Sequence, residues 1–184
     1  MNVLLGITGS IAAINSCQIA GALKKQGHTV KAVMSKGGER FITPLSVATI
    51  TENRVLTSMW DEDGSIQHIE LARWADVFVI APASASIIAY IAQGIPNGIV
   101  GTIALAIEEK IPKLFAPAMN TQMYMNPLTQ RNINTLKEVG WIEIPPVTQT
   151  LACGEVGVGA MAKKPTIIQM IESAQKGENQ CTLL

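Results

Sequence analysis

The chain has 184 residues, 14 of them basic and 14 acidic, so its formal net charge is zero. This length suits one domain with a full core, and the charge balance argues against partners bound by general electrostatics, such as nucleic acid or acidic membranes. The three cysteines form no CxxC pair and no zinc-like spacing, which argues against a disulfide framework or a metal and favours a reducing, cytoplasmic setting.

Strand-like and helix-like segments alternate along the chain. The pattern predicts strands at residues 2–7, 29–34, 77–81, 113–116 and 141–144. It predicts helices from Ile11 until Gly27, around 39–50, through Ile87, through Ile99, over 127–139 and near 166–174. Such alternation indicates a parallel sheet covered by helices on both faces, a three-layer α/β/α domain. We expect this single domain at residues 1–175 and a flexible tail at 176–184.

A long uncharged stretch at residues 77–107 raises the question of a membrane span. Pro82, Gln93-Gly94 and Pro96-Asn97-Gly98 interrupt it, which favours a strand and two buried helices instead. The first apolar run likewise resembles a strand more than a secretory signal, because no basic residues precede it. A stretch buried so thoroughly in a small domain also suggests that subunits pack together.

The loops that follow the predicted strands are the places to look for a ligand, because parallel sheets bind ligands beyond the carboxyl ends of their strands. Gly9-Ser10 follows the first strand, where backbone N–H groups can hold a phosphate, although an ordinary capping serine is the alternative. The segment from Ser35 to Gly38 follows the second strand and offers a phosphate approach or a plain turn. Because the GxGxxG and Walker lysine patterns are absent, a mononucleotide is favoured over NAD.

A histidine, an asparagine and a cysteine are the other candidates. The imidazole of His68 suits proton transfer, although a packed or surface histidine is the commoner case. Asn120 follows the strand at 113–116, where its amide can donate to a carboxylate or can simply form a turn. Cys153 lies beside Gly154, Gly157 and Gly159, a spacing that is typical of a mobile loop able to close over a ligand.

Several short motifs together resemble the homo-oligomeric flavin-containing cysteine decarboxylases, from about Val3 to about Ile171. In chain order they are GITGSIAA from Gly6, FITPLS from Phe41, HIELARWAD from His68, APASA from Ala81, PAMNTQMYMNP from Pro117 and LACGEVGVGAMA from Leu151. Each motif is short, but their common order and spacing make the resemblance specific.

The resemblance implies a flavodoxin-like or Rossmann-like fold, assembled as a homotrimer, trimers of trimers or a homododecamer, with FMN near the subunit contacts. By position it places the flavin against Gly9, Ser10, Ile11, Ser35, Ser84, Ala85, Ser86 and Ala118. It likewise implies a substrate site formed by Asn120, Met123, Ala152, Cys153 and Gly154.

The resemblance also implies a chemistry, with His68 as the catalytic base, Asn120 as the binder of the substrate carboxylate and Cys153 as a proton donor. The flavin first oxidises the thiol side, because a cysteine carboxylate has no electron sink for the carbanion that loss of CO₂ would create. Carbon dioxide then leaves an enethiol. Return of the electrons, with a proton from Cys153, gives an aminoethanethiol and no net oxidation.

We therefore expect a flavin-dependent carboxy-lyase that converts 4′-phospho-N-pantothenoylcysteine to 4′-phosphopantetheine, a step toward coenzyme A. One alternative is a decarboxylase of the C-terminal cysteine of a lantibiotic-type peptide, and a second is a non-catalytic regulatory subunit. Cys153 favours the small thiol, because the better-known peptide enzymes stop at the enethiol and lack the ACG loop. The chain departs from the family pattern at Asn15, Ser86 and Gly98, which bears on flavin contacts and substrate choice.

Overall fold

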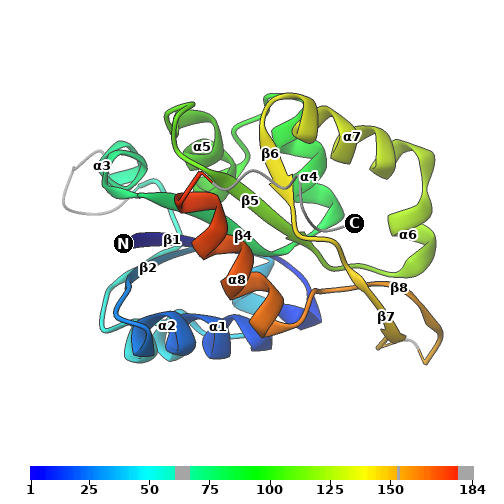
Figure 1. Ribbon diagram of the computed structural model, residues 1–184, viewed down its shortest axis with the longest axis horizontal. Helices are drawn as coiled ribbons and strands as arrows, with labels where there is room; N and C mark the ends of the chain where they lie inside the picture. The colour runs from blue at the N-terminus through cyan, green and yellow to red at the C-terminus, as the bar shows by residue number, and fades with distance from the viewer. Residues whose placement is uncertain (61–66, 153, 178–184) are drawn as a thin grey trace.

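A parallel six-stranded sheet with strand order β3-β2-β1-β4-β5-β6 forms the centre of the molecule (Figure 1). The computed structural model describes residues 1–184 apart from 61–66, 153 and 178–184. The strands of this sheet are β1 (Asn2–Ile7), β2 (Thr29–Met34), β3 (Val55–Leu56), β4 (Val77–Ala83), β5 (Lys113–Pro117) and β6 (Trp141–Glu143). The predicted three-layer fold with a parallel sheet is confirmed, and all five predicted strands are present within two residues of the expected bounds.

The alternation of side chains along the central strands explains why helices cover both faces of the sheet. In β1, Val3, Leu5 and Ile7 point into one hydrophobic core, while Leu4 points into the other. All seven residues of β4 are buried. Burial of each such Leu or Ile contributes about 1.5–3 kcal/mol, so both faces must be shielded from water.

Two groups of helices provide that shielding, as Figure 1 shows. The core beside Val3 is closed by α1 (Ile14–Lys25), α2 (Pro44–Thr51) and α8 (Lys164–Gln175). The core beside Leu4 is closed by α3 (Gln67–Trp74), α4 (Ala85–Ala92), α5 (Gly98–Ala106) and α7 (Pro127–Glu138). The long uncharged stretch is therefore β4, α4 and α5, and none of the helices among the described residues is long and apolar enough to cross a membrane.

The helix expected around residues 39–50 is interrupted, which corrects the sequence-based prediction. A 3₁₀ turn at Gly38–Arg40 comes first, and α2 begins separately at Pro44. Thr43 caps this second helix, because its Oγ1 accepts from the backbone N–H of Ser46 at 3.1 Å. A proline at the first helical position after a capping threonine favours a new start over continuation.

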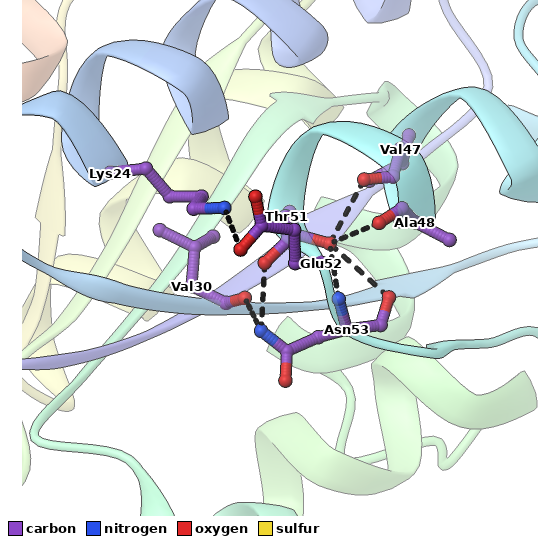
Figure 2. Close-up of polar contacts among 7 residues, drawn as sticks. All are labelled: Lys24, Val30, Val47, Ala48, Thr51, Glu52 and Asn53. Carbon is purple, nitrogen blue, oxygen red and sulfur yellow. Dashed lines mark hydrogen bonds and ion pairs between the residues drawn. The ribbon is translucent and has the colours of Figure 1, made fainter.

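The connection from α2 into β3 is held by side-chain contacts (Figure 2). Glu52 adopts a left-handed conformation with φ 55°, which ends the helix, and its carboxylate lies 2.9 Å from Lys24 Nζ. Thr51 Oγ1 donates to the Val47 carbonyl at 2.9 Å, and Asn53 Nδ2 donates to the Val30 carbonyl at 3.1 Å. These bonds fix α2 beside β2 and start β3, a two-residue strand that the sequence pattern missed.

The glycine-rich segment that was expected to be a loop is a two-stranded antiparallel ribbon, which we call the β7–β8 ribbon. It consists of β7 (Val147–Thr150) and β8 (Val156–Ala160), joined by a turn. It extends away from the main sheet at the end that also holds α6 (Thr121–Met125) (Figure 1). The prediction of a loop was wrong because the alternation of Val and Gly in β8 is a strand pattern hidden by the glycines.

Candidate active site

A cavity of about 490 Å³ opens beyond the carboxyl ends of β1, β4 and β5, where ligands bind in parallel sheets. Its walls come from the turn after β1, the start of α4, the turn between β5 and α6, and the β7–β8 ribbon. The volume lies in the range of roughly 300–1,000 Å³ that is typical of cofactor and substrate pockets. The described part of the lining contains no charged side chain, so its polar contacts are hydroxyls, amides and backbone groups.

The side chain of Thr8 fixes two walls of this cavity to each other. Its Oγ1 donates to the Pro82 carbonyl at 2.7 Å and accepts from the Ser84 N–H at 2.9 Å. Ser16 makes a similar hydrogen bond one residue earlier in β4, since its Oγ donates to the Ala81 carbonyl at 2.7 Å. Both hydroxyl residues are buried, so they have no water to bond with as an alternative. The turn after β1 and the turn after β4 therefore form one rigid floor.

Ser10 and Ser84 stand at helix starts on this floor. Ser10 Oγ accepts from the Ala12 N–H at 3.3 Å, and Ser84 Oγ accepts from the Ile87 N–H at 3.3 Å. Both residues also line the cavity. Ser10 is therefore a capping serine, as the alternative interpretation had it. Capping is compatible with anion binding, because further N–H groups of the first turn still point beyond the helix end.

The segment at Ser35 packs against the turn after β1, and its residues are not among those that line the cavity. Ser35 Oγ accepts from the Gly38 N–H at 3.2 Å, which folds the segment into a tight turn. Gly37 packs against Gly9, where an added Cβ on Gly9 would lie 3.1 Å from the Gly37 Cα. Ser35 is not among the residues that line the cavity, whereas the other predicted flavin contacts are.

The turn between β5 and α6 contributes the predicted carboxylate binder. Asn120 lines the cavity, and its Oδ1 accepts from the Gln122 N–H at 2.8 Å, so it caps α6. Ala118 and Met123 line the same wall. The Ala118 N–H donates to the Ala83 carbonyl at 3.1 Å, which ties this turn to β4.

The far end of α6 is anchored by Tyr124, whose hydroxyl donates to Glu143 Oε1 at 2.9 Å. Burial, followed by the charge of Glu143, raises the pKa of Tyr124 to about 12. Lys137 Nζ lies 3.7 Å from the other carboxylate oxygen of Glu143. The tyrosine therefore remains a proton donor over the physiological range and holds α6, and with it Met123, beside β6.

The β7–β8 ribbon closes one side of the cavity. Ala152 lines it together with Gln149, Thr150 and Leu151, whereas Gly154 sits in the ribbon turn and does not. The turn is held by the Leu151 N–H, which donates to the Glu155 carbonyl at 2.8 Å. Cys153, the predicted proton donor, lies outside the described residues.

His68, the predicted base, does not line the cavity of its own chain. It belongs to the first turn of α3, is half-buried, and is not among the cavity residues. In Figure 1, α3 lies at the left of the molecule and the β7–β8 ribbon at the lower right. A single chain thus brings Asn120 and Ala152 to the predicted flavin contacts and leaves His68 apart.

Sequence reasoning missed several residues of the site. Thr8 and Ser16 were not singled out. The available signals are that Thr8 places a hydroxyl at the end of an apolar strand and that Ser16 places one on the buried face of a helix, where each needs a hydrogen-bond partner. Gln149, Thr150 and Met161 line the cavity from a segment that was expected to be loop. Asn15, a departure from the family pattern that was not predicted to contact a ligand, also lines the cavity, as does Ser86, which was.

The fold and the cavity together define an α/β protein that binds a small molecule at the carboxyl edge of a parallel sheet. Residues 1–176 match the family described as Flavoprotein, and the chain belongs to this family. It is 46% identical over 172 residues to a probable phosphopantothenoylcysteine decarboxylase of Streptococcus mutans, covering 92% of this chain and 96% of that protein. It is 40% identical to the coenzyme A biosynthesis bifunctional protein CoaBC of Vibrio vulnificus, covering 92% of this chain and 42% of that longer protein.

Solved structures agree with these relatives. A mutant of PPC decarboxylase complexed with pantothenoylaminoethenethiol superposes with a TM-score of 0.83 at 37% identity, covering 93% of this chain and 96% of that one. The FMN binding protein AtHal3 superposes with a TM-score of 0.81 at 36% identity, covering 96% and 97%. An FMN-dependent cysteine decarboxylase, SpaF, gives a TM-score of 0.81 at 26% identity, covering 96% and 97%.

Proposed function

We propose that this protein is a flavin-dependent carboxy-lyase that decarboxylates 4′-phospho-N-pantothenoylcysteine to 4′-phosphopantetheine in coenzyme A biosynthesis. The observation that carries the proposal is that one cavity is lined by both the flavin-contact motifs and the substrate motifs, including Ser10, Ser84, Asn120 and Ala152. The similarity to the Streptococcus mutans protein over 96% of its length supports the same substrate. The domain responsible is residues 1–175, and we place its activity in the cytoplasm.

FMN fits the cavity by size and by the kind of groups that line it. The turn after β1 and the start of α4 would hold the phosphate and neighbouring polar atoms, through N–H groups and the hydroxyls of Ser10 and Ser84. The apolar side chains of Ile11, Ala85 and Ala118 line the same space and suit a flat ring system. When bound, the flavin supplies the reversible two-electron chemistry that makes decarboxylation of a cysteine possible.

The residues of this chain then bind the substrate and move its protons. The Asn120 side chain uses Oδ1 to cap α6, and its Nδ2 is a donor suited to a carboxylate. Cys153 directly follows Ala152 in the sequence, and Ala152 lines the cavity, which supports the thiol of Cys153 as the proton donor. The described residues of the lining carry no charged side chain, and this favours release of CO₂, because a carboxylate is poorly stabilised where no cation among them faces it.

We further propose that His68 acts as the base in the cavity of a neighbouring subunit, within a homo-oligomer that is a trimer or an assembly of trimers. The separation of His68 from the cavity of its own chain motivates this assignment. The cavity rim is also apolar and open, since Ile11, Ile14 and Met123 keep 52%, 52% and 49% of their surface exposed. A second copy that covers such a rim would exclude water and complete the site.

The test is a spectrum of the purified protein followed by mass spectrometry of its products. We expect bound flavin released as FMN, and a product of 4′-phospho-N-pantothenoylcysteine that has lost CO₂ alone. The Cys153→Ser variant should instead release a product that has lost CO₂ and two electrons, the enethiol level named in the relative's complex. Normal product from that variant at an undiminished rate would refute the role of Cys153.

The same assay separates the two alternatives. A peptide with a C-terminal cysteine is included because SpaF, a cysteine decarboxylase, shares the fold at 26% identity. Oxidative decarboxylation of that peptide, with no turnover of the small thiol, would replace the proposed substrate. A colourless protein that cannot be reconstituted with FMN would favour a regulatory subunit and overturn the enzyme assignment.

A further inference from the structure

The β7–β8 ribbon lies in direct contact with the start of α6 through two glycines of β8. Gly157 faces Thr121, and an added Cβ would collide with the Thr121 Oγ1. Gly159 has φ +133° and faces the backbone, where an added Cβ would collide with the Met119 carbonyl oxygen. The Met119 N–H donates to the Gly159 carbonyl at 2.9 Å. The absence of two side chains therefore allows the ribbon to reach the turn that carries Asn120.

The contact at Gly157 is one of packing. Thr121 Oγ1 is buried and has no hydrogen-bond partner among the described residues. Burial of a hydroxyl without a hydrogen-bond partner destabilises the folded state. Here the ribbon covers the hydroxyl of Thr121 and keeps it from water. We call this close contact between Gly157 and Thr121 the lock. One extra methyl group at Gly157 cannot be placed without movement of the ribbon or of α6.

This lock controls a wall of the cavity. Leu151 and Ala152 line the cavity from one end of the ribbon, and Gly159 and Ala160 line it from β8. Asn120, which immediately precedes Thr121, lines the facing wall. A shift of the ribbon relative to α6 therefore changes the distance between the ribbon side and the Asn120 side, without a direct effect on the floor held by Thr8.

We infer that Gly157 and Gly159 are positioning residues that seat the β7–β8 ribbon on residues 119–121 and thereby set the affinity for the substrate. The identity of that substrate rests on the proposed function. The flavin contacts on the floor are held separately, by Thr8 and Ser16, so the two glycines act on substrate binding rather than on retention of the cofactor.

The test is a size-compensation experiment. Gly157→Ala should raise KM for 4′-phospho-N-pantothenoylcysteine by on the order of tenfold to a hundredfold, with unchanged flavin content, because misplacement of a binding wall is costly. Thr121→Ala removes the Oγ1 and Cγ2 that meet the added methyl and leaves only the Cβ of residue 121, 3.1 Å away, which requires a small shift. The double variant should therefore recover KM to within about threefold of Thr121→Ala alone.

Gly159→Ala provides the contrasting arm. Its added methyl meets a backbone oxygen and requires a left-handed φ, so Thr121→Ala should give no recovery. Gly140→Ala is the matched control, since Gly140 also has a positive φ of +85° but no atom lies within 4 Å of the added Cβ. It should lower thermal stability by a similar backbone strain and leave KM unchanged.

A readout that does not depend on turnover is hydrogen exchange of the Met119 amide, which bonds to Gly159. Exchange should accelerate in Gly157→Ala and slow again in the double variant. Unchanged exchange, or exchange and KM that fail to recover in the double variant, would overturn the seating role.

If Gly157→Ala is insoluble, a soluble double variant supports the lock and an insoluble one contradicts it. Absence of turnover in the unaltered protein would refute the proposed substrate, while the exchange result would still decide the seating.

Discussion

Thr8 is a single polar side chain at the end of an apolar strand, yet it joins two of the segments that form the cavity. It both donates and accepts, to the Pro82 carbonyl and from the Ser84 N–H, in a fully buried position. A buried hydroxyl with two backbone partners cannot be replaced by a methyl group without leaving both partners unsatisfied. The geometry of the cavity floor therefore depends on this hydroxyl, together with that of Ser16.

Thr8→Val should lower the free energy of unfolding by about 1–3 kcal/mol, because it keeps the shape of the side chain and removes both bonds. FMN binding should weaken by roughly tenfold, because the Ser84 N–H and the turn after β1 lose their common anchor. Thr8→Ser is the control that retains the hydroxyl. Denaturant unfolding and a fluorescence titration with FMN measure the two effects, and equal behaviour of both variants would contradict the role.

Tyr124 gives a pH-dependent prediction at the same scale. Burial raises its pKa from the model-compound value of 10.0 to about 12 in the folded chain. Above pH 10 the unfolded chain loses this proton while the folded chain retains it, so stability is complete below about pH 10 and declines as the pH rises toward 12. Tyr124→Phe should be less stable near neutrality and should show a shallower decline above pH 10, as measured by urea unfolding at successive pH values.

At the scale of elements, the start of α4 is both a structural cap and a wall of the cavity. Ser84 caps α4 through the Ile87 N–H, and Thr43 caps α2 in the same way through the Ser46 N–H, away from the cavity. Ser84→Ala and Thr43→Ala should each cost about 1 kcal/mol of stability. We expect FMN affinity to fall in the Ser84 variant alone, as followed by flavin fluorescence. An equal loss of affinity in both would indicate a general loosening of the fold.

The regular elements were predictable from sequence because their signals are local. The apolar run of β4 and the helical period of α7 each decide the conformation without help from distant residues. The β7–β8 ribbon was missed because Gly157 and Gly159 weaken its strand pattern, and what stabilises it is contact with Met119 and Thr121, far away in sequence. The cavity position of Ser10 and Ser84 followed from the strand–turn–helix rule.

The site as a whole was harder to predict than its parts. Sequence motifs grouped His68 with Asn120, but α3 and the cavity lie in different regions of one chain. A motif records which residues belong to a reaction and carries no information about which subunit supplies each of them. The supporting role of the Ser35 turn was hidden for a similar reason, because the packing of Gly37 against Gly9 appears only in three dimensions.

At the scale of the whole molecule, the proposed sharing of the site between subunits can be tested by complementation. His68→Asn and Asn120→Ala should each be inactive alone. If the base comes from a neighbouring subunit, random mixing during co-expression at equal levels should give about a quarter of sites with both native residues, and hence about a quarter of normal activity. Activity per site measured against flavin content checks this. A mixture that remains inactive, although it contains mixed oligomers by mass spectrometry, would place both groups in one chain.

The uncharged lining of the cavity has a consequence for how the protein responds to its solution. Both proposed ligands are anions, yet the described walls offer them dipoles and hydrogen bonds rather than lysine or arginine partners. Attraction of that kind acts over short distances and is little weakened by dissolved ions. Recognition at these walls should therefore tolerate wide variation in ionic strength, and selectivity among phosphorylated metabolites should follow from the direction of their donors and acceptors more than from their total charge.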